Sequence, residues 1–206
     1  AAVVGERSAI EALDVSSFPV TWEERSPVLT IGAALAADAP QLHAGRAGNI
    51  LVRGRVARGD VERAFMQAPV VIEGQFETGF VEHAYIEPEA GWARRVGDRI
   101  EITASTQAPY MDRDDTAAIM GLPPENIRII PSACGGGFGS KLDLSVQPYI
   151  ALAAWVTGRP AAMVYSRPES IQSTTKRHPG VMRTRMAATR EGDLLAMDFE
   201  GDFNTG

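Results

Sequence analysis

Hydrophobic and polar residues alternate along several short stretches of the chain, which is the pattern expected of half-buried β-strands. Two pairs of these stretches are separated by short turns rich in glycine and aspartate, Gly97-Asp98 and Glu191-Gly192-Asp193. Each pair is therefore predicted to form an antiparallel hairpin. The predicted strands cover residues 18–24, 70–78, 84–95, 99–106, 126–132, 161–166, 182–189 and 194–203, and the run at 161–166 is apolar enough to be buried.

Apolar residues at helical spacing predict helices between these strands. Ser8 and Asp60 stand where an N-cap side chain is expected, and Gly121 and Gly158 stand where two helices should end. The predicted helices cover residues 6–13, 29–37, 60–68, 112–120 and a segment with Pro148 in its first turn that stops at Gly158.

The helix around Pro148 is expected to bury Tyr149, Leu152, Ala153 and Val156. Strands and helices mix along the chain without strict βαβ alternation. The sequence therefore predicts an α+β fold with mostly antiparallel pairing. An internal boundary is expected in the loop at residues 37–50, where proline and glycine replace any clear periodicity.

The composition limits the kinds of molecule that the chain can be expected to bind. The net charge of −6 argues against binding to nucleic acid or to an anionic membrane. The sequence shows neither an apolar run of membrane-spanning length nor a signal peptide, so we expect no membrane insertion and a cytoplasmic location. Cys134 is the only cysteine, which excludes an internal disulfide, a cysteine zinc cluster and an iron–sulfur site within these 206 residues.

A glycine-rich loop lies between a predicted strand and a predicted helix. Four of the five residues 135–139 are glycine, which lets another group approach the backbone amides closely. Such a loop suggests a nucleotide- or phosphate-binding module. However, Ser140 stands where a Walker A loop needs glycine and Leu142 where it needs a hydroxyl, and Ser140 also breaks the dinucleotide fingerprint. The nucleotide module therefore stays as the alternative function.

Six short motifs then occur in a fixed order. They are EHAYIEPEA at 82–90, STQAP at 105–109, GGGFGSK at 135–141, GRP at 158–160, SRPE at 166–169 and KRHP at 176–179. This series resembles the molybdenum-cofactor subunit of the xanthine dehydrogenase and aldehyde oxidoreductase family, the molybdenum hydroxylases. The resemblance runs from about Gly54 to Gly206 and more weakly through the first 40 residues.

The resemblance implies a fragment of a larger subunit. Residues 1–48 would be the C-terminal part of a small, hammerhead-like α/β domain with its linker, and residues 49–206 the first part of a molybdopterin-binding domain, truncated at its C-terminus. The implied reaction hydroxylates an aldehyde or an N-heteroaromatic (xanthine-like) substrate with water as oxygen source. We expect the catalytic base, a glutamate, in the missing C-terminal part, so that the fragment holds no catalytic residue and is inactive alone.

The implied cofactor is a molybdenum-pterin, expected in its cytosine dinucleotide form. Partner domains or subunits would carry a 2Fe-2S cluster and FAD, and the remaining molybdopterin domains of the same subunit would complete the pocket. By the resemblance, Gln107 approaches the molybdenum and hydrogen-bonds one of its oxygen ligands, in its second coordination shell. The backbones of Gly136, Gly137, Phe138 and Gly139 would contact the molybdenum ligands and the pterin.

Leu142 is expected to line the substrate pocket. Purine-oxidising members of the family often have a glutamate at this position, and an apolar side chain cannot form the same hydrogen bond. The sequence therefore favours an aldehyde or a less polar heteroaromatic over a purine.

The remaining motif residues are expected to be structural. Arg167 and Glu169 would cap or tie the helix that starts there, and Arg177 with His178 would brace the chain. Isolated histidines such as His83 are more often hydrogen-bonded packing residues than ligands. Two further motif residues, Glu87 and Glu89, are interpreted as solvent-facing.

Overall fold

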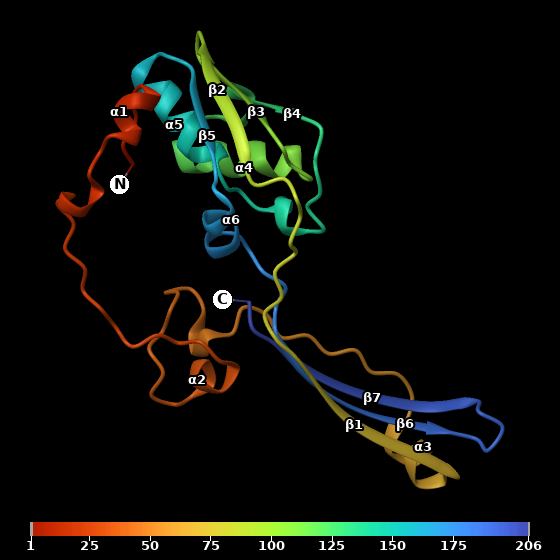
Figure 1. Ribbon diagram of the computed structural model, residues 1–206. Helices are drawn as coiled ribbons and strands as arrows, with labels where there is room; N and C mark the ends of the chain where they lie inside the picture. The colour runs from red at the N-terminus through yellow and green to blue at the C-terminus, as the bar shows by residue number, and fades with distance from the viewer. Residues whose placement is uncertain (1, 206) are drawn as a thin grey trace. The chain divides into compact units, whose positions relative to one another are not determined.

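The computed structural model describes residues 2–205, with the exception of the Ser17 side chain. The chain folds into two compact units, each built from segments far apart in the sequence (Figure 1). Unit 1 contains residues 2–21 and 82–176, and unit 2 contains residues 22–81 and 177–205. No helix among the described residues is long and apolar enough to cross a membrane.

Unit 1 is built on a four-stranded sheet with the order β4-β3-β2-β5. Strands β2 (Ala90–Val96) and β3 (Arg99–Ala104) form the predicted hairpin. β5 (Ala161–Val164) adds to β2 in antiparallel direction, whereas β4 (Ile127–Pro131) runs parallel to β3. The α+β prediction is confirmed, with β3–β4 as its parallel pair.

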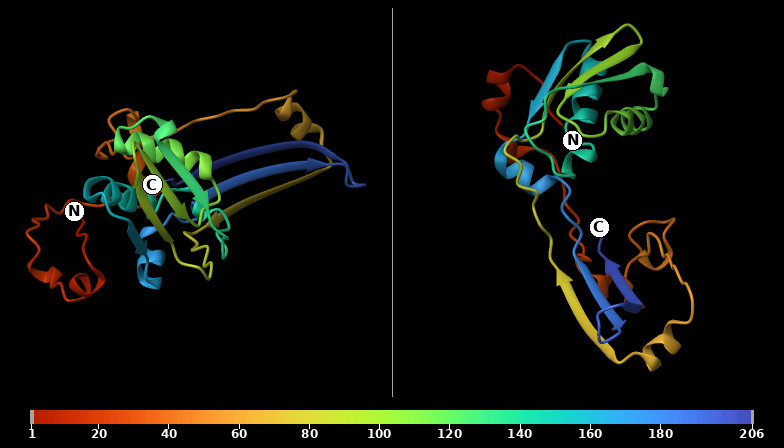
Figure 2. Two further views of the ribbon diagram at one scale, coloured as in Figure 1. Left: turned by 90° about the horizontal axis from the view of Figure 1, so that it is seen from above. Right: turned by 90° about the vertical axis from the view of Figure 1, so that its right-hand side faces the viewer.

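Two longer helices, α4 (Pro109–Met120) and α5 (Gln147–Thr157), pack on this sheet (Figure 2). Both end at a glycine in the left-handed conformation, Gly121 and Gly158, as predicted. The core joins apolar residues of the sheet and the two helices into one cluster. Its members are Ala93, Ile100, Ile102, Ala104, Ala117, Ile127, Val146, Ile150, Ala151 and Ala154.

The prediction of which α5 face is buried was wrong. The helix buries Ile150, Ala151 and Ala154, while Tyr149 and Val156 are exposed. Both faces repeat at the helical period, so periodicity alone could not choose between them. The buried face packs closely on the sheet. A Cβ added to Gly91 of β2 would lie 3.1 Å from the Ile150 Cδ1, so the helix uses the space that this glycine leaves.

The structure corrects three smaller expectations. Residues 18–24 form no strand. Helix α1 (Arg7–Glu11) begins after Glu6, not at Ser8. β5 has one neighbour, β2, and is therefore an edge strand with an exposed Val164 rather than a buried one. Helix α6 (Arg167–Ser173) does begin with the expected contribution of Glu169, which forms a capping box with Ser166.

Unit 2 holds an antiparallel sheet with the order β1-β6-β7. Its strands are β1 (Val70–Thr78), β6 (Gly180–Ala188) and β7 (Leu194–Phe203), and the last two form the second predicted hairpin. Helix α3 (Val61–Gln67) is capped by Asp60 as predicted and packs Phe65 against Ala187 and Ala196. A shorter helix, α2 (Ile31–Leu35), lies in the predicted segment 29–37.

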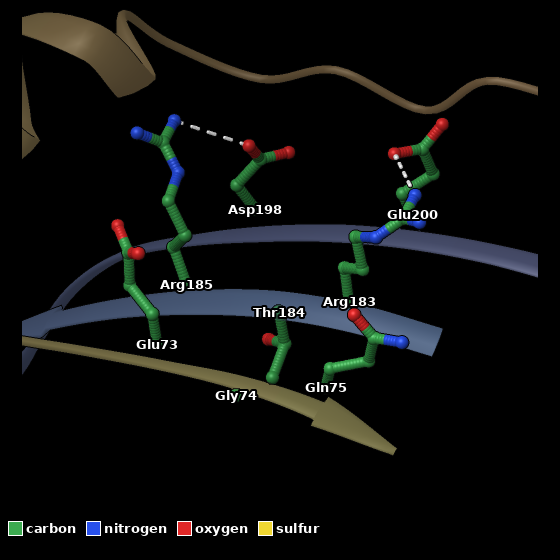
Figure 3. A pocket seen from close by; sticks show the side chains of 8 residues that line it. All are labelled: Glu73, Gly74, Gln75, Arg183, Thr184, Arg185, Asp198 and Glu200. Atoms are coloured by element: carbon green, nitrogen blue, oxygen red, sulfur yellow. Dashed lines mark hydrogen bonds and ion pairs between the residues drawn. The ribbon is translucent and has the colours of Figure 1, made fainter. Parts of the chain in front are cut away.

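The two faces of the unit 2 sheet differ in chemistry. The register places Glu73, Arg185 and Asp198 side by side on one face, which Figure 3 shows as an open hollow lined by charged side chains. On the opposite face the register aligns Ile72, Met186 and Met197. This second face is apolar and exposed, with 61% of Ile72 accessible to solvent.

Candidate cofactor-binding site

The glycine-rich loop of unit 1 lies against residues 83–87, the irregular segment that precedes β2. A Cβ on Gly135 would lie 2.7 Å from the Glu87 Cβ, and one on Gly136 would lie 3.0 Å from the Tyr85 Cβ. Gly136 also has a φ of +100°, which L side chains rarely adopt. Glycine is thus required here because the loop backbone lies directly on its neighbours.

Gln107 contacts the next part of the same loop. A Cβ on Gly137 would lie 2.9 Å from the Gln107 Cδ, so the side-chain amide occupies the space that this glycine leaves. The backbone amide of Gly139 donates to the Gln107 side-chain Oε1 at 3.0 Å. The backbone amide of Gln107 donates to the Lys141 carbonyl at 2.9 Å. The structure therefore brings together Gln107, Gly137 and Gly139.

These contacts leave a set of hydrogen-bond donors. Because the Gln107 Oε1 faces a backbone donor, the Nε2 is directed away, and it has no acceptor among residues 2–205. The backbone amides of Gly136, Gly137 and Phe138 likewise have no acceptor in the described part of the chain. Gly137 itself is buried. Buried amides normally have a partner, so the Gly137 amide in particular fits an anionic or oxygen-rich ligand, and the more exposed donors of Gln107, Gly136 and Phe138 lie beside it.

The two side chains predicted beside these donors are both exposed. Phe138 has 74% of its surface accessible and a backbone φ of +53°. Leu142 lies at the end of the short 3-10 helix Ser140–Leu142. Both side chains are therefore open to solvent in this chain.

Glu87 was wrongly interpreted as solvent-facing. Its Oε2 accepts three hydrogen bonds, from the Gly135 amide at 2.7 Å, the Ser105 hydroxyl at 2.8 Å and the Lys141 ammonium at 2.8 Å. Burial opposes the charge on Glu87, but the hydrogen bonds from Lys141, Gly135 and Ser105 outweigh burial and lower its pKa. The Lys141 side chain is 2% exposed, so this ion pair is shielded from water on the lysine side.

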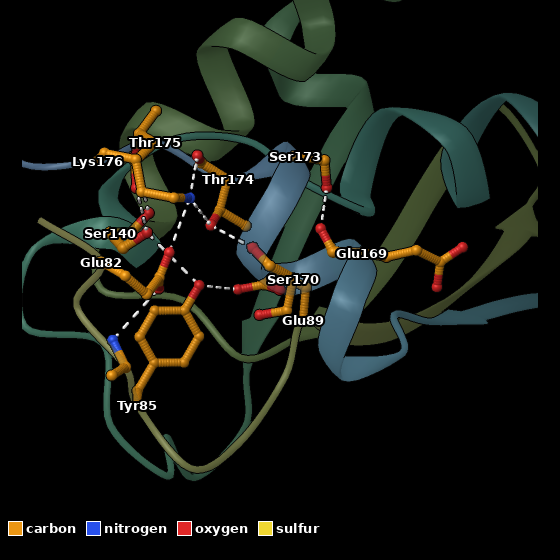
Figure 4. Close-up of polar contacts among 11 residues, drawn as sticks. Glu82, Tyr85, Glu89, Ser140, Glu169, Ser170, Ser173, Thr174, Thr175 and Lys176 are labelled. Atoms are coloured by element: carbon orange, nitrogen blue, oxygen red, sulfur yellow. Dashed lines mark hydrogen bonds and ion pairs between the residues drawn. The ribbon is translucent and has the colours of Figure 1, made fainter. Parts of the chain in front are cut away.

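Glu89 was also wrongly interpreted as solvent-facing, because it is buried. The Tyr85 hydroxyl donates to the Glu89 Oε1 and lies 3.4 Å from the Ser140 Oγ (Figure 4). Ser140 in turn donates to the Thr175 carbonyl at 3.1 Å. The segment before β2 is thereby connected to the residue that follows the glycine-rich loop.

A second ion pair fixes the start of that segment. The Lys176 ammonium lies 2.9 Å from the Glu82 Oε2, and both side chains appear in Figure 4. Burial opposes the charge on Glu82, and the hydrogen bond and charge of Lys176 more than compensate, so that the pKa of Glu82 is lowered. Arg167 donates to the Ile86 carbonyl, so it ties α6 to the same segment as expected.

Histidines do not form a ligand cluster here. The His83 Nδ1 is buried without a hydrogen-bond partner among the described residues, so the expectation that it is hydrogen-bonded was wrong. His178 is exposed, and the Arg177 amide pairs with the Val81 carbonyl within unit 2. No group of three or more histidine, cysteine, aspartate or glutamate side chains able to hold a metal ion occurs in the described part of the chain.

The geometry gives the phosphate-loop alternative no support. Two of the loop amides, those of Gly135 and Gly139, already donate to acceptors within the protein. The Glu87 carboxylate is the acceptor for the Gly135 amide, so this end of the loop has no unpaired amide to offer a phosphate.

Comparisons with known proteins then decide the family. The molybdopterin cofactor-binding domain family matches residues 42–206. The chain belongs to this family. It is 39% identical over 197 residues to the nicotinate dehydrogenase large molybdopterin subunit of Eubacterium barkeri, a match covering 95% of this chain and 45% of that subunit. A probable xanthine dehydrogenase subunit of Bacillus subtilis is 37% identical over 207 residues, which cover all of this chain and 28% of that protein.

Solved structures agree with this assignment. The aldehyde oxidoreductase of Desulfovibrio gigas matches with a TM-score of 0.76 and 32% identity, over 88% of this chain and 20% of that one. Quinoline 2-oxidoreductase from Pseudomonas putida 86 matches with a TM-score of 0.77 and 26% identity, over 87% and 23% of the two chains. The chain therefore spans less than half the length of each of these relatives, and the predicted resemblance is confirmed.

Proposed function

We propose that this chain supplies one wall of the molybdenum-pterin site of a molybdenum hydroxylase. The proposal depends on the position of the Gln107 side-chain amide. The backbone amide of Gly139 donates to its oxygen, and the side-chain amide lies against the buried Gly137. The exposed edge of this arrangement is a row of neutral donors. The cofactor, when bound, supplies the redox chemistry that removes two electrons from the substrate carbon.

The residues of this chain would bind and orient that cofactor. The amides of Gly136, Gly137 and Phe138 can donate to pterin or to oxygen ligands without adding charge, and so can the Gln107 Nε2. Preorganised donors of this kind stabilise negative charge at a fixed position. Because Lys141 neutralises Glu87 next to the loop, the carboxylate does not oppose an anionic ligand there.

The proposed reaction is the oxidative hydroxylation of an aldehyde or an N-heteroaromatic compound, with water as oxygen source. Leu142 is exposed near the loop and cannot hydrogen-bond a heterocycle, which favours a less polar substrate than a purine. Relatives named nicotinate dehydrogenase and quinoline 2-oxidoreductase support a heteroaromatic, and a relative named aldehyde oxidoreductase supports the other option.

The rest of the machinery would lie outside this chain, since the relatives are more than twice as long. We propose that residues 1–48 end a small α/β domain and that residues 49–206 begin the molybdopterin-binding domain. Further molybdopterin domains would supply the base glutamate, and other domains or subunits would carry the 2Fe-2S cluster and FAD. The pterin would be the cytosine dinucleotide form, the enzyme cytoplasmic, and the 206-residue chain alone inactive.

Elemental and pterin analysis of the longer protein that contains this sequence tests the proposal. We expect molybdenum and a pterin to co-purify with activity towards aldehydes or N-heteroaromatics, and oxygen from labelled water to enter the product. An active, intact enzyme that contains no molybdenum would contradict the proposed function.

A further inference from the structure

The two ends of the glycine-rich loop converge on one carboxylate oxygen. The Gly135 amide, at the start of the loop, donates to the Glu87 Oε2 at 2.7 Å. The Lys141 ammonium, from the residue two positions after the last glycine of the loop, donates to the same oxygen at 2.8 Å. The Ser105 hydroxyl, at the end of β3, completes the set and also accepts from Lys141 at 3.1 Å.

Lys141 reaches this oxygen from a buried position. Its ammonium lies 4.9 Å from the centre of the Tyr85 ring, and its side chain is nearly inaccessible to water. Removing a lysine from water is costly, and a buried ion pair is often no more stabilising than apolar residues of the same size. The best-attested benefit of such a pair is that it selects one conformation.

The conformation selected here is that of the residues in the candidate site. The backbone carbonyl of Lys141 accepts from the backbone amide of Gln107 at 2.9 Å. The Gln107 side chain in turn accepts from Gly139, two residues before Lys141. A displacement of Lys141 would therefore change both contacts that orient Gln107.

We propose that Glu87 and Lys141 are positioning residues that clamp the two ends of the glycine-rich loop and thereby set the direction of the Gln107 amide. Their significance for catalysis rests on the proposed function, but the clamp is a property of this chain alone. It needs neither molybdenum nor pterin to be measured. A role in general stability would lower the stability of unit 1 as a whole without acting on the loop in particular.

Amide hydrogen exchange in the 206-residue chain, measured by NMR, separates these roles. In Lys141→Met we expect the Gly139 amide to exchange about tenfold faster, because the loop loses a charged hydrogen bond at one end. The amides of Ile100 and Ile102 in β3 should keep their rates. Lys176→Met breaks the other ion pair of this region and serves as the matched control, with Gly139 exchange unchanged.

A double variant gives the sharper test. Glu87→Gln combined with Lys141→Met removes both charges, so it should recover thermal stability relative to Lys141→Met. Fast exchange at Gly139 should nevertheless persist, because residue 141 no longer reaches residue 87. Glu87→Gln alone removes the charge from the acceptor of Gly135 and Lys141, so the weakened clamp should also speed Gly139 exchange, though by less than Lys141→Met. This variant keeps the test possible if Lys141→Met does not fold.

Two results would overturn the proposal. One is unchanged Gly139 exchange in folded Lys141→Met or Glu87→Gln. The other is a double variant that recovers thermal stability and Gly139 protection together, which would mean that the pair acts only on general stability. Either result would leave the proposed function intact, because molybdenum analysis of the longer protein tests that function independently.

Discussion

The two units of the chain bury their sheets to different extents. In unit 1, helices α4 and α5 join the sheet in a single core cluster. In unit 2, the short helix α3 buries Phe65 against Ala187 and Ala196, and one sheet face is left apolar and exposed. The candidate site belongs to unit 1. The glycine-rich loop, whose close contacts tolerate little movement, therefore belongs to the better-packed unit, as a preorganised site requires.

The largest contrast is expected from one substitution made in both sheets. Ile102→Ala in β3 removes a fully buried side chain and should destabilise the protein by about 3 kcal/mol. Ile72→Ala in β1 changes a residue that is 61% exposed and should cost less than about 1 kcal/mol. Denaturant unfolding measures both. Equal costs would show that the units do not differ in packing as described.

A glycine substitution tests the site within unit 1. Gly137→Ala would force the new methyl group onto the Gln107 side chain and should cost about 1–3 kcal/mol, comparable to overpacking a core. Gly54→Ala in unit 2 has open space around the added Cβ and should be neutral or slightly stabilising. The expectation fails if thermal unfolding ranks the two variants in the opposite order.

A smaller effect is expected for the ion pairs of unit 2. Arg185 pairs with Glu62 of α3 at 2.9 Å and with Asp198 of β7 at 3.1 Å, and it lies 4.4 Å from the Phe65 ring centre. Arg185→Met should therefore lower stability by less than either of the two main substitutions above, and by less still at high salt. Arg183→Met loses a single exposed contact and is the control; an equal loss there would contradict the account.

The pH dependence of unit 1 should show two opposite contributions. The lowered pKa of Glu87 gives stability that is present above the ordinary glutamate pKa and is lost as the pH falls through the lowered value. Burial raises the pKa of Asp112, despite hydrogen bonds from Thr106 and Gln147, so its contribution becomes more favourable as the pH falls through the raised value.

Unfolding curves between neutral and acidic pH can separate these contributions. The stability deficit of Glu87→Gln relative to the wild type should shrink on acidification. Any advantage of Asp112→Asn at neutral pH should also shrink, because the wild-type carboxyl becomes protonated. A deficit of Glu87→Gln that grows at acidic pH would contradict the assigned direction of its pKa.

Alternation and turn residues predicted the two hairpins, and cap residues predicted the ends of α4 and α5, because these signals are local. The buried face of α5 was not predictable in this way, since two faces share one period. The glycine-rich loop was singled out by its glycine density, and Gln107 through the ordered motifs. Glu87 was missed because residues 82–89 are largely irregular, and strand periodicity does not apply to such a segment.

The position of Lys141 in the sequence could have predicted that it pairs with a glutamate. A lysine two residues after a run with four glycines in five residues has few local partners, and the acidic motif at 82–90 is an available source of one. A buried lysine nearly always needs an acidic or hydrogen-bonding partner. Which of the three glutamates pairs with it depends on the path of an irregular segment, and that path follows from tertiary packing.

The central claim is that Gln107 donates to the bound cofactor from one wall of the site. The most direct measurement compares Gln107→Ala with Gln75→Ala, an exposed glutamine of β1, in the longer enzyme. Loss of one preorganised donor should lower kcat on the order of 100-fold in Gln107→Ala while molybdenum content is retained. Gln75→Ala should match the wild type. Unchanged turnover in Gln107→Ala would contradict the claim.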